Sequence, residues 1–303
     1  MMKRLYLASP RGFCAGVRRA ISIVENSIES NKNKDVYVYH EIVHNKFIIE
    51  KLKAEGVKFI DDLNLAPSNS ELILSAHGAS KSIEKKAEEK KISILDATCP
   101  LVKKIHRELV RLIDEGYEVL LIGHREHPEI VGTVGQVDSH IHIISERATY
   151  DELPDIVDKD KIAFLTQTTL SQDDIEGIIE LLNEKYPNIE GYSDICYATQ
   201  NRQNAVKELC RYAEVILVIG SPNSSNSNRL REVAELNGVK AYLIDSFEDI
   251  DYELFDKVER IGITAGASAP ECLVTELIEK LKSLGYGDLE EIVICEENIE
   301  FKV

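Results

Sequence analysis

Short apolar segments that end in polar loops recur along the chain and alternate with amphipathic helical segments. The segments LILSA, EVLLIG, IAFLT, EVILVIG and IGITA have the length of buried strands, and each runs directly into a polar loop. This alternation is typical of α/β proteins with parallel sheets, in which ligands bind at the carboxyl ends of the strands. We therefore predict an α/β fold whose function lies in the loops that follow the strands.

The polar loops recur in register with three of the six cysteines, which indicates an internal threefold repeat. Each third of the chain contains a cysteine, then a first polar loop, then a second. In chain order these are Cys14 with HEIVHN and SAHGAS, Cys99 with GHREHPE and TQTTLS, and Cys196 with GSPNSSNSN and TAGASAP. We predict three similar α/β units, each a small parallel sheet with flanking helices, over residues 1–97, 98–193 and 194–285, with a C-terminal tail over 286–303.

Each of the three repeat cysteines directly precedes a helical pattern of apolar residues. Pro100, after Cys99, suits the first turn of such a helix. A cysteine at a helix N-terminus lies at the positive end of the helix dipole, which lowers the pKa of the thiol and favours the thiolate. Three thiolates at equivalent positions of three units are expected to converge near a pseudo-threefold axis.

The alternative is that the cysteines are buried and inert, as free cysteines commonly are. That interpretation suits Cys210, on an apolar helical stripe, and Cys295, in the strand-like EIVIC; packing is also the first expectation for Cys272. It suits the three repeat cysteines poorly, because each stands at a polar junction. No CxxC pair occurs, so a metal site must gather distant cysteines. Spacing alone leaves a Cys₃His zinc site and an iron–sulfur cluster with three cysteine ligands open.

The polar loops are rich in side chains that donate hydrogen bonds and can bind an anion such as a diphosphate. These side chains, together with one carboxylate, are His44, His77, His124, His127, Glu129, Thr168, Ser224, Ser225, Asn226 and Ser268. Serine and asparagine runs also form ordinary turns and helix caps. Their recurrence at equivalent places beside the cysteines favours a site. We expect surface or packing roles for the remaining histidines, which are His40, His106, His140 and His142.

Glu129, which follows His127-Pro128, is the best candidate for a general acid. A carboxyl in a small closed pocket can hold a proton near neutral pH. The competing interpretation is that Glu129 caps amide groups at the start of a helix.

The net charge of −17 argues against a nucleic acid partner, because phosphate binding needs a basic surface. An anionic substrate would have to be held by local dipoles and hydrogen bonds. The N-terminus resembles no signal peptide, and the apolar segments are too short to span a membrane. We expect a cytoplasmic enzyme without a membrane or nucleic acid partner.

Nine ordered motifs spread over nearly the whole chain resemble the 4-hydroxy-3-methylbut-2-enyl diphosphate reductase family, the terminal enzymes of the methylerythritol phosphate route to isoprenoids. The motifs are PRGFCAGV, HEIVHN, SAHG, DATCPLV, GHREHPE, TQTTLS, CYATQNRQ, SSNSNRL and TAGASAP. The resemblance implies a pseudo-threefold trefoil of three α/β units around one 4Fe–4S cluster. It also implies a two-electron removal of the substrate's allylic hydroxyl, which gives isopentenyl and dimethylallyl diphosphates, with electrons from an external donor such as ferredoxin or flavodoxin.

Carried onto this sequence, the resemblance assigns Cys14, Cys99 and Cys196 as cluster ligands, with one iron open to substrate. Glu129 would lie on the proton path, Thr168 would position the substrate hydroxyl, and His127 would belong to the pocket. The residues implied in diphosphate binding are His44, His77, Ser224, Ser225, Asn226 and Ser268. Three alternatives are a cluster-dependent hydro-lyase that needs no reductant, a non-catalytic metal- or anion-binding regulator, and a structural zinc protein.

Overall fold

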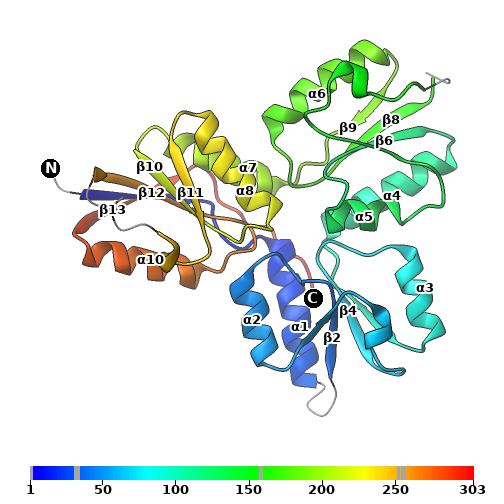
Figure 1. Cartoon of the computed structure of the whole chain (residues 1–303), viewed down its shortest axis with the longest axis horizontal. Coiled ribbons are helices and arrows are strands. Elements are labelled where there is room, and N and C mark those ends of the chain that lie inside the picture. Colours follow the sequence, from blue (N-terminus) through cyan, green and yellow to red (C-terminus); the bar gives the residue numbers. More distant parts are fainter. Residues whose placement is uncertain (1–2, 31–34, 157–159, 251–252, 254–256) are drawn as a thin grey trace. The chain divides into compact units, whose positions relative to one another are not determined.

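The computed structural model describes residues 3–30, 35–156, 160–250, 253 and 257–303. Within this part of the chain, the strands form three parallel sheets of five, four and four strands (Figure 1). The chain divides into two compact units, of which unit 1 comprises 1–17, 44–50 and 197–300, and unit 2 comprises 18–43, 51–196 and 301–303. Unit 1 contains the five-stranded sheet and unit 2 contains both four-stranded sheets.

Helices connect and flank these sheets. They are α1 (Ala15–Ser30), α2 (Lys46–Ala54), α3 (Lys81–Glu89), α4 (Pro100–Asp114), α5 (Pro128–Val134), α6 (Gln172–Lys185), α7 (Tyr197–Leu209), α8 (Ser225–Leu236) and α10 (Glu271–Ser283). No helix within the described ranges has both the length and the apolar character that crossing a membrane requires.

Unit 2 holds two sheets with the same strand order. The first has the order β3-β2-β4-β5, formed by β2 (Val36–Tyr39), β3 (Lys58–Ile60), β4 (Glu71–Leu74) and β5 (Ser93–Asp96). The second has the order β7-β6-β8-β9, formed by β6 (Glu118–Ile122), β7 (His142–Ile144), β8 (Ile162–Thr166) and β9 (Glu190–Tyr192). All pairings in both sheets are parallel, as the alternation of strands and helices predicts.

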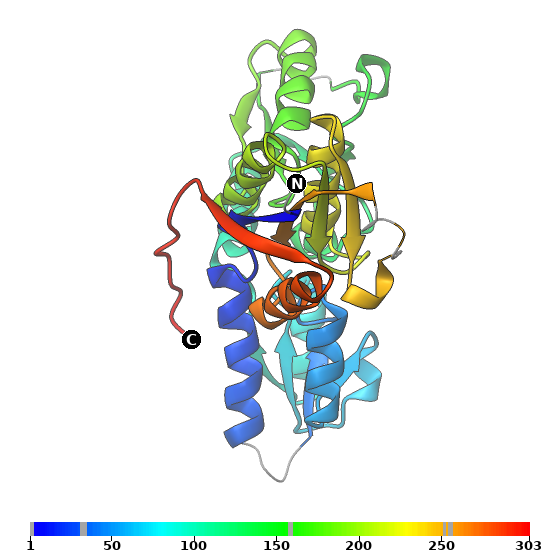
Figure 2. The same cartoon turned by 90° about the vertical axis from the view of Figure 1, so that its left-hand side faces the viewer.

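The sheet of unit 1 repeats that order and adds one strand. It has the order β11-β10-β12-β1-β13, formed by β1 (Lys3–Ser9), β10 (Val215–Ile219), β11 (Lys240–Ile244), β12 (Arg260–Ala265) and β13 (Tyr286–Val293). The first strand of the chain therefore takes the fourth place in the third repeat. Figure 2 shows the last strand, β13, alongside β1, with which it pairs in parallel.

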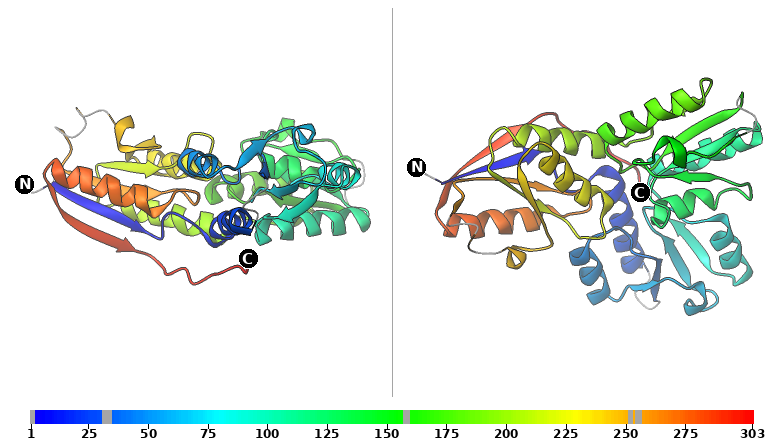
Figure 3. Two further views of the ribbon diagram at one scale, coloured as in Figure 1. Left: turned by 90° about the horizontal axis from the view of Figure 1, so that it is seen from below. Right: turned by 45° about the horizontal axis from the view of Figure 1, so that its top comes forward.

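Strand β1 is buried on both faces, which explains its central place. Leu5 and Leu7 pack with apolar residues of α10 on one face, where Figure 3 shows α10 beside β1 and β13. Tyr6 and Ala8 pack with residues of α7 and α8 on the other face. A strand in a parallel sheet is covered on both faces by helices, so a continuous apolar run suits this position.

The predicted α/β class with three similar parallel sheets is confirmed by the common strand order. The sequence assigned β1 to the first unit and residues 286–303 to a tail, whereas the structure pairs β1 and β13 with the strands of the third repeat. The domain division at residues 97, 193 and 285 stays a prediction.

Candidate active site

The three repeat cysteines occupy equivalent positions in the structure. Each lies between the fourth strand of one repeat and the helix that leads into the next: Cys14 between β1 and α1, Cys99 between β5 and α4, and Cys196 between β9 and α7. Cys99 is the N-cap residue of α4, and Pro100 fills the first helical position as the sequence predicts. The prediction that each cysteine opens a helix is confirmed.

A backbone hydrogen bond repeats this equivalence at each cysteine. The N–H group of Cys14 donates to the carbonyl of Ala267 (3.2 Å), that of Cys99 to Ala76 (3.0 Å), and that of Cys196 to Thr168 (3.1 Å). Each acceptor lies just past the third strand of its repeat, in the second polar loop. The polar loop therefore holds the cysteine backbone in the same way three times.

All three repeat cysteines are half-buried and free of disulfides. Cys14 belongs to unit 1, whereas Cys99 and Cys196 belong to unit 2. Over the described ranges, the structure gathers no three His, Cys, Asp or Glu side chains into a group able to hold a metal ion. The donor set nevertheless suits a soft metal or a cluster, because cysteine sulfur is a soft ligand.

The other cysteines differ from these three. Cys210 packs against the apolar core under α7 and α8, and burial raises the pKa of its thiol to about 11, so its expected packing role is confirmed. Cys295 is half-buried just beyond the end of β13, and burial raises its pKa. Cys272 is exposed in the first turn of α10, so the packing role expected for it is wrong.

Glu129 and Thr168 form the most buried polar pair among the predicted site residues of unit 2. The backbone N–H of Thr168 donates to Oε1 of Glu129 and the Thr168 hydroxyl donates to Oε2, both at 2.7 Å. Glu129 is only 2% exposed. Burial raises the pKa of its carboxyl to about 7; the two bonds from Thr168 lower it, and the nearby Asp194 adds to the rise. This carboxyl can therefore exchange a proton near neutral pH.

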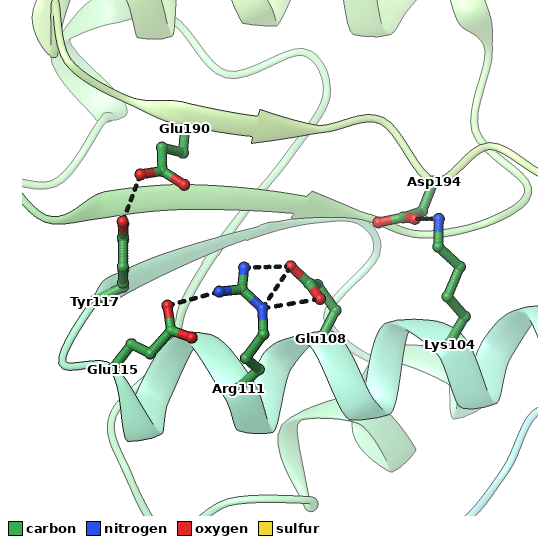
Figure 4. Close-up of polar contacts among 7 residues, drawn as sticks. All are labelled: Lys104, Glu108, Arg111, Glu115, Tyr117, Glu190 and Asp194. Atoms are coloured by element: carbon green, nitrogen blue, oxygen red, sulfur yellow. Dashed lines mark hydrogen bonds and ion pairs between the residues drawn. The ribbon is translucent and has the colours of Figure 1, made fainter.

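Asp194, whose charge acts on Glu129, is bound to helix α4. Its carboxylate accepts from Nζ of Lys104 at 2.9 Å, as Figure 4 shows, and its backbone N–H donates to the Thr166 hydroxyl at 2.8 Å. Burial raises the pKa of Asp194, and Lys104 opposes that rise. The sequence reasoning missed Asp194, because only its position just before Cys196 marks it.

His77 and His127 lie edge to face in the same unit, with ring centroids 5.6 Å apart. His127 caps α5, and its Nδ1 accepts from the N–H of Glu129 at 3.2 Å. The loop of His77 is closely packed: Gly78 has a φ of +83°, and a Cβ there would lie 2.7 Å from Cε1 of His106. His106, for which a surface or packing role was expected, thus packs against Gly78 in the His77 loop.

In unit 1, His44 and Ser268 are joined directly. The Ser268 hydroxyl donates to the backbone carbonyl of His44 at 2.8 Å. The next residues of the His44 loop are held by Ser221, whose hydroxyl accepts from the N–H of Lys46 at 2.9 Å and donates to Asp245. The loops after β10 and β12 therefore fix the backbone that carries His44.

Helix α8 begins in the Ser/Asn-rich loop of the same unit. Ser224 caps the helix and accepts from the backbone N–H (3.3 Å) and the hydroxyl (3.0 Å) of Ser227, and Ser225 is the first helical residue. Asn226 is only 5% exposed. Both polar atoms of its amide are buried without a hydrogen-bond partner among the residues that the structure describes. Because such atoms are costly to bury unpaired, this amide is suited to a polar ligand.

The predicted site residues thus form two groups, one in each unit. Unit 1 holds Cys14, His44, Ser224, Ser225, Asn226 and Ser268, and unit 2 holds His77, Cys99, His127, Glu129, Thr168 and Cys196. The first group offers hydroxyl, amide and imidazole donors that suit an anion, and the second offers a protonatable carboxyl. His124, also in unit 2, is exposed and lies 3.7 Å from a carboxylate oxygen of Glu146.

Comparisons with known proteins agree over almost the whole chain. The family model described as LytB protein matches residues 5–282. An Acinetobacter baylyi protein named 4-hydroxy-3-methylbut-2-enyl diphosphate reductase is 48% identical over 99% of this chain and 96% of its own length. One of the same name from Ectopseudomonas mendocina is 50% identical over 98% of this chain and 96% of its own. The solved structure of the Plasmodium falciparum reductase matches with a TM-score of 0.95 and 38% identity, covering 100% of this chain and 96% of that one.

Proposed function

Because this chain belongs to the LytB protein family, we propose that it reduces the allylic diphosphate for which its relatives are named. It is an oxidoreductase that removes the allylic hydroxyl of 4-hydroxy-3-methylbut-2-enyl diphosphate to give isopentenyl and dimethylallyl diphosphates. Two electrons and two protons are consumed: one proton leaves with the hydroxyl as water, and the other is added to the allylic carbon skeleton. Because amino-acid side chains do not supply these electrons, a redox cofactor and an external donor are required.

We propose that Cys14, Cys99 and Cys196 hold one 4Fe–4S cluster, with one iron left without a protein ligand. The observation that carries this proposal is the equivalent hydrogen bond from each cysteine N–H to the second polar loop of its repeat. Three thiols at equivalent positions suit the three cysteine corners of a cubane. When bound, such a cluster supplies electrons and a Lewis-acidic iron for the substrate oxygen. We propose ferredoxin, flavodoxin or a similar reduced carrier as the electron donor.

We propose Glu129 as the group that delivers a proton to the leaving hydroxyl. Its burial and a pKa of about 7 support this role, because a carboxyl that is half protonated near neutral pH can both give up and regain a proton. Thr168 holds both carboxyl oxygens and so fixes the direction in which the proton is offered. The His127 ring accepts a hydrogen bond from the Glu129 backbone N–H, and so helps to hold Glu129 in position.

We propose that the diphosphate is bound by donors from the polar loops. These are His44, His77, His127, Ser224, Ser225, Asn226 and Ser268, with Thr168 contacting the substrate hydroxyl. The unpartnered buried amide of Asn226 supports this assignment most directly. Local donors are needed because the net charge of −17 repels an anion at long range. We also propose the predicted trefoil around the cluster and the cytoplasmic location.

The test is strictly anaerobic purification, iron and sulfide analysis, and turnover of the allylic diphosphate with and without a reductant. We expect about four irons per chain, as for one cubane, and product only with the reductant. Glu129→Gln should keep its iron and lower turnover by about 100-fold or more, as the loss of a general acid does. The exposed Glu126→Gln, three residues away, is the matched control and should retain full activity.

Each alternative predicts a different result. Product formed equally well without a reductant would indicate a hydro-lyase. Zinc in place of iron would indicate a structural metal protein. Iron without any turnover of the diphosphate would favour a regulator that binds metal but does not catalyse.

A further inference from the structure

Arg202, on helix α7, is a charged side chain that the structure buries completely, with 0% exposure. Its guanidinium donates to the Gly12 carbonyl from Nε at 3.0 Å and from Nη2 at 2.7 Å. Nη1 donates to the Ala198 carbonyl at 2.9 Å. Because a buried guanidinium must have its donors satisfied, these contacts fix the position of Arg202 and of the backbone it binds. The Gly12 carbonyl accepts two of these hydrogen bonds and is therefore held most firmly.

The counter-charge of Arg202 comes from the segment that follows β13. Glu297 accepts from Nη1 at 3.0 Å and from Nη2 at 3.2 Å, and its side chain is only 9% exposed. Nδ2 of Asn201 also donates to Glu297 at 3.1 Å. A bidentate, buried arginine–carboxylate pair has a defined geometry, which an exposed ion pair lacks. The residues after β13 are therefore part of the support for the Gly12 backbone.

Gly12 stands two residues before Cys14. Its N–H donates to the Ala265 carbonyl at 3.0 Å, so both its N–H and its carbonyl are engaged. Its φ is +63°, and a Cβ there would lie 3.2 Å from the Ala269 carbonyl, so glycine is the residue that fits. With Gly12 held on one side and the N–H of Cys14 bonded to Ala267 on the other, the backbone that presents the thiol is fixed.

A second arginine holds the segment before Cys99 in the same manner. Arg19, on α1, donates to the carbonyls of Asp96 at 3.3 Å and Thr98 at 3.2 Å. Its Nε donates to the carbonyl of Lys302 at 2.8 Å, which is again a residue after β13. Both arginines therefore bind backbone carbonyls within three residues of a repeat cysteine, and both are held by the C-terminal segment.

We propose that Arg202 and Arg19 are positioning residues for Cys14 and Cys99, and that Glu297 and Lys302 of the C-terminal segment hold the two arginines in place. The inference rests on the proposed function in assigning these cysteines to a cluster. It concerns the backbone itself: Arg202 restricts the segment before Cys14, and Arg19 restricts the segment before Cys99. Partners that orient metal ligands typically change metal affinity by about 10- to 100-fold when they are lost.

The test compares Arg202→Lys and Arg19→Lys with Arg211→Lys as the matched control. Arg211, just beyond the end of α7, pairs with Glu208 at the surface with its side chain 74% exposed, so this change alters an arginine–glutamate pair without touching a cysteine loop. The iron-free chains are alkylated with iodoacetamide under native conditions, and the rate at each cysteine is read by mass spectrometry of peptides. The exposed Cys272 is the internal standard. Urea titration of the same chains reports their stability.

We expect the rate at Cys14 to rise several-fold in Arg202→Lys alone, and the rate at Cys99 to rise in Arg19→Lys alone. After anaerobic loading with iron and sulfide, both variants should lose their visible cluster absorbance in air about 10-fold faster than the unaltered chain. The reduced clusters should also show an altered electron paramagnetic resonance line shape. Arg211→Lys should match the unaltered chain in every readout.

Equal alkylation rates in all variants would overturn the proposal, as would a uniform increase at all three repeat cysteines that follows the urea midpoint. A general loss of stability cannot produce a cysteine-specific pattern. If the unaltered chain takes up no iron, the proposed function fails, while the alkylation pattern still decides whether the arginines position the loops.

Discussion

Replacement of Glu129 by glutamine should make the stability of the chain less dependent on pH. Glutamine has the same shape, and it keeps the contacts with Thr168, because its carbonyl accepts from the backbone N–H and its amide donates to the hydroxyl. The substitution therefore removes the ionisation of the buried carboxyl while leaving the packing unchanged.

The magnitude follows from the difference between the ordinary carboxyl pKa of 4.5 and the value of about 7 in the folded chain. Because the folded state holds the proton more tightly, this group's contribution to stability is complete below pH 4.5 and is lost as the pH rises through 7. Each pH unit between these values costs about 1.4 kcal/mol. The glutamine variant should match the unaltered chain near pH 4 and exceed its unfolding free energy by about 3 kcal/mol at pH 8.

Urea titrations of the iron-free chains from pH 4 to 8, followed by circular dichroism because the chain has no tryptophan, measure this difference. The exposed Glu126→Gln, measured over the same range, is the control for the loss of one negative charge, and the rise predicted for Glu129→Gln is the rise in excess of this control. A stability difference for Glu129→Gln that stays constant with pH, or that falls as the pH rises, would refute the reasoning.

Three further changes have distinct expected outcomes. Cys196→Ser should abolish tight iron binding after anaerobic loading, measured by metal analysis, whereas exposed Cys272→Ser should leave the iron content unchanged. Asn226→Ala removes a buried amide that has no partner among the described residues, so calorimetry should show about tenfold weaker binding of inorganic diphosphate, with no loss of stability in urea. Gly78→Ala should lower the unfolding free energy by about 1–3 kcal/mol in urea titrations, because its φ of +83° and the His106 ring 2.7 Å from the new Cβ both oppose a side chain.

The elements and the cysteine positions were predictable because their signals are local. IAFLT, for example, is the whole of strand β8, and each repeat cysteine stands next to its helix as the apolar pattern predicts. Glu129 and Thr168 could be predicted as site residues from the polar loops that contain them. Their mutual hydrogen bonds and the raised pKa of Glu129 could not, because these depend on burial between segments distant in the sequence.

Long-range pairing set the limits of prediction. An apolar strand such as β1 has the same pattern whichever sheet it joins, so its place between β12 and β13 was not foreseen. The sequence does not distinguish Arg202 from any other polar residue of a helix, because its partner Glu297 lies far along the chain. Cys272 was expected to pack against the core but is exposed, because the face of a helix that meets solvent depends on tertiary packing.

The place of β1 in its sheet has a consequence for biosynthesis. Both of its neighbours, β12 and β13, lie within residues 260–293, so β1 leaves the ribosome long before either of its partners. The two four-stranded sheets that lead into Cys99 and Cys196 are complete much earlier and can fold while synthesis continues. The loop of Cys14 takes its final form only after β12, β13 and Glu297 have left the ribosome. A nascent chain that lacks β12 and β13 can therefore offer two of the three proposed cluster ligands next to folded sheets, and assembly of the proposed cluster must wait for those two strands.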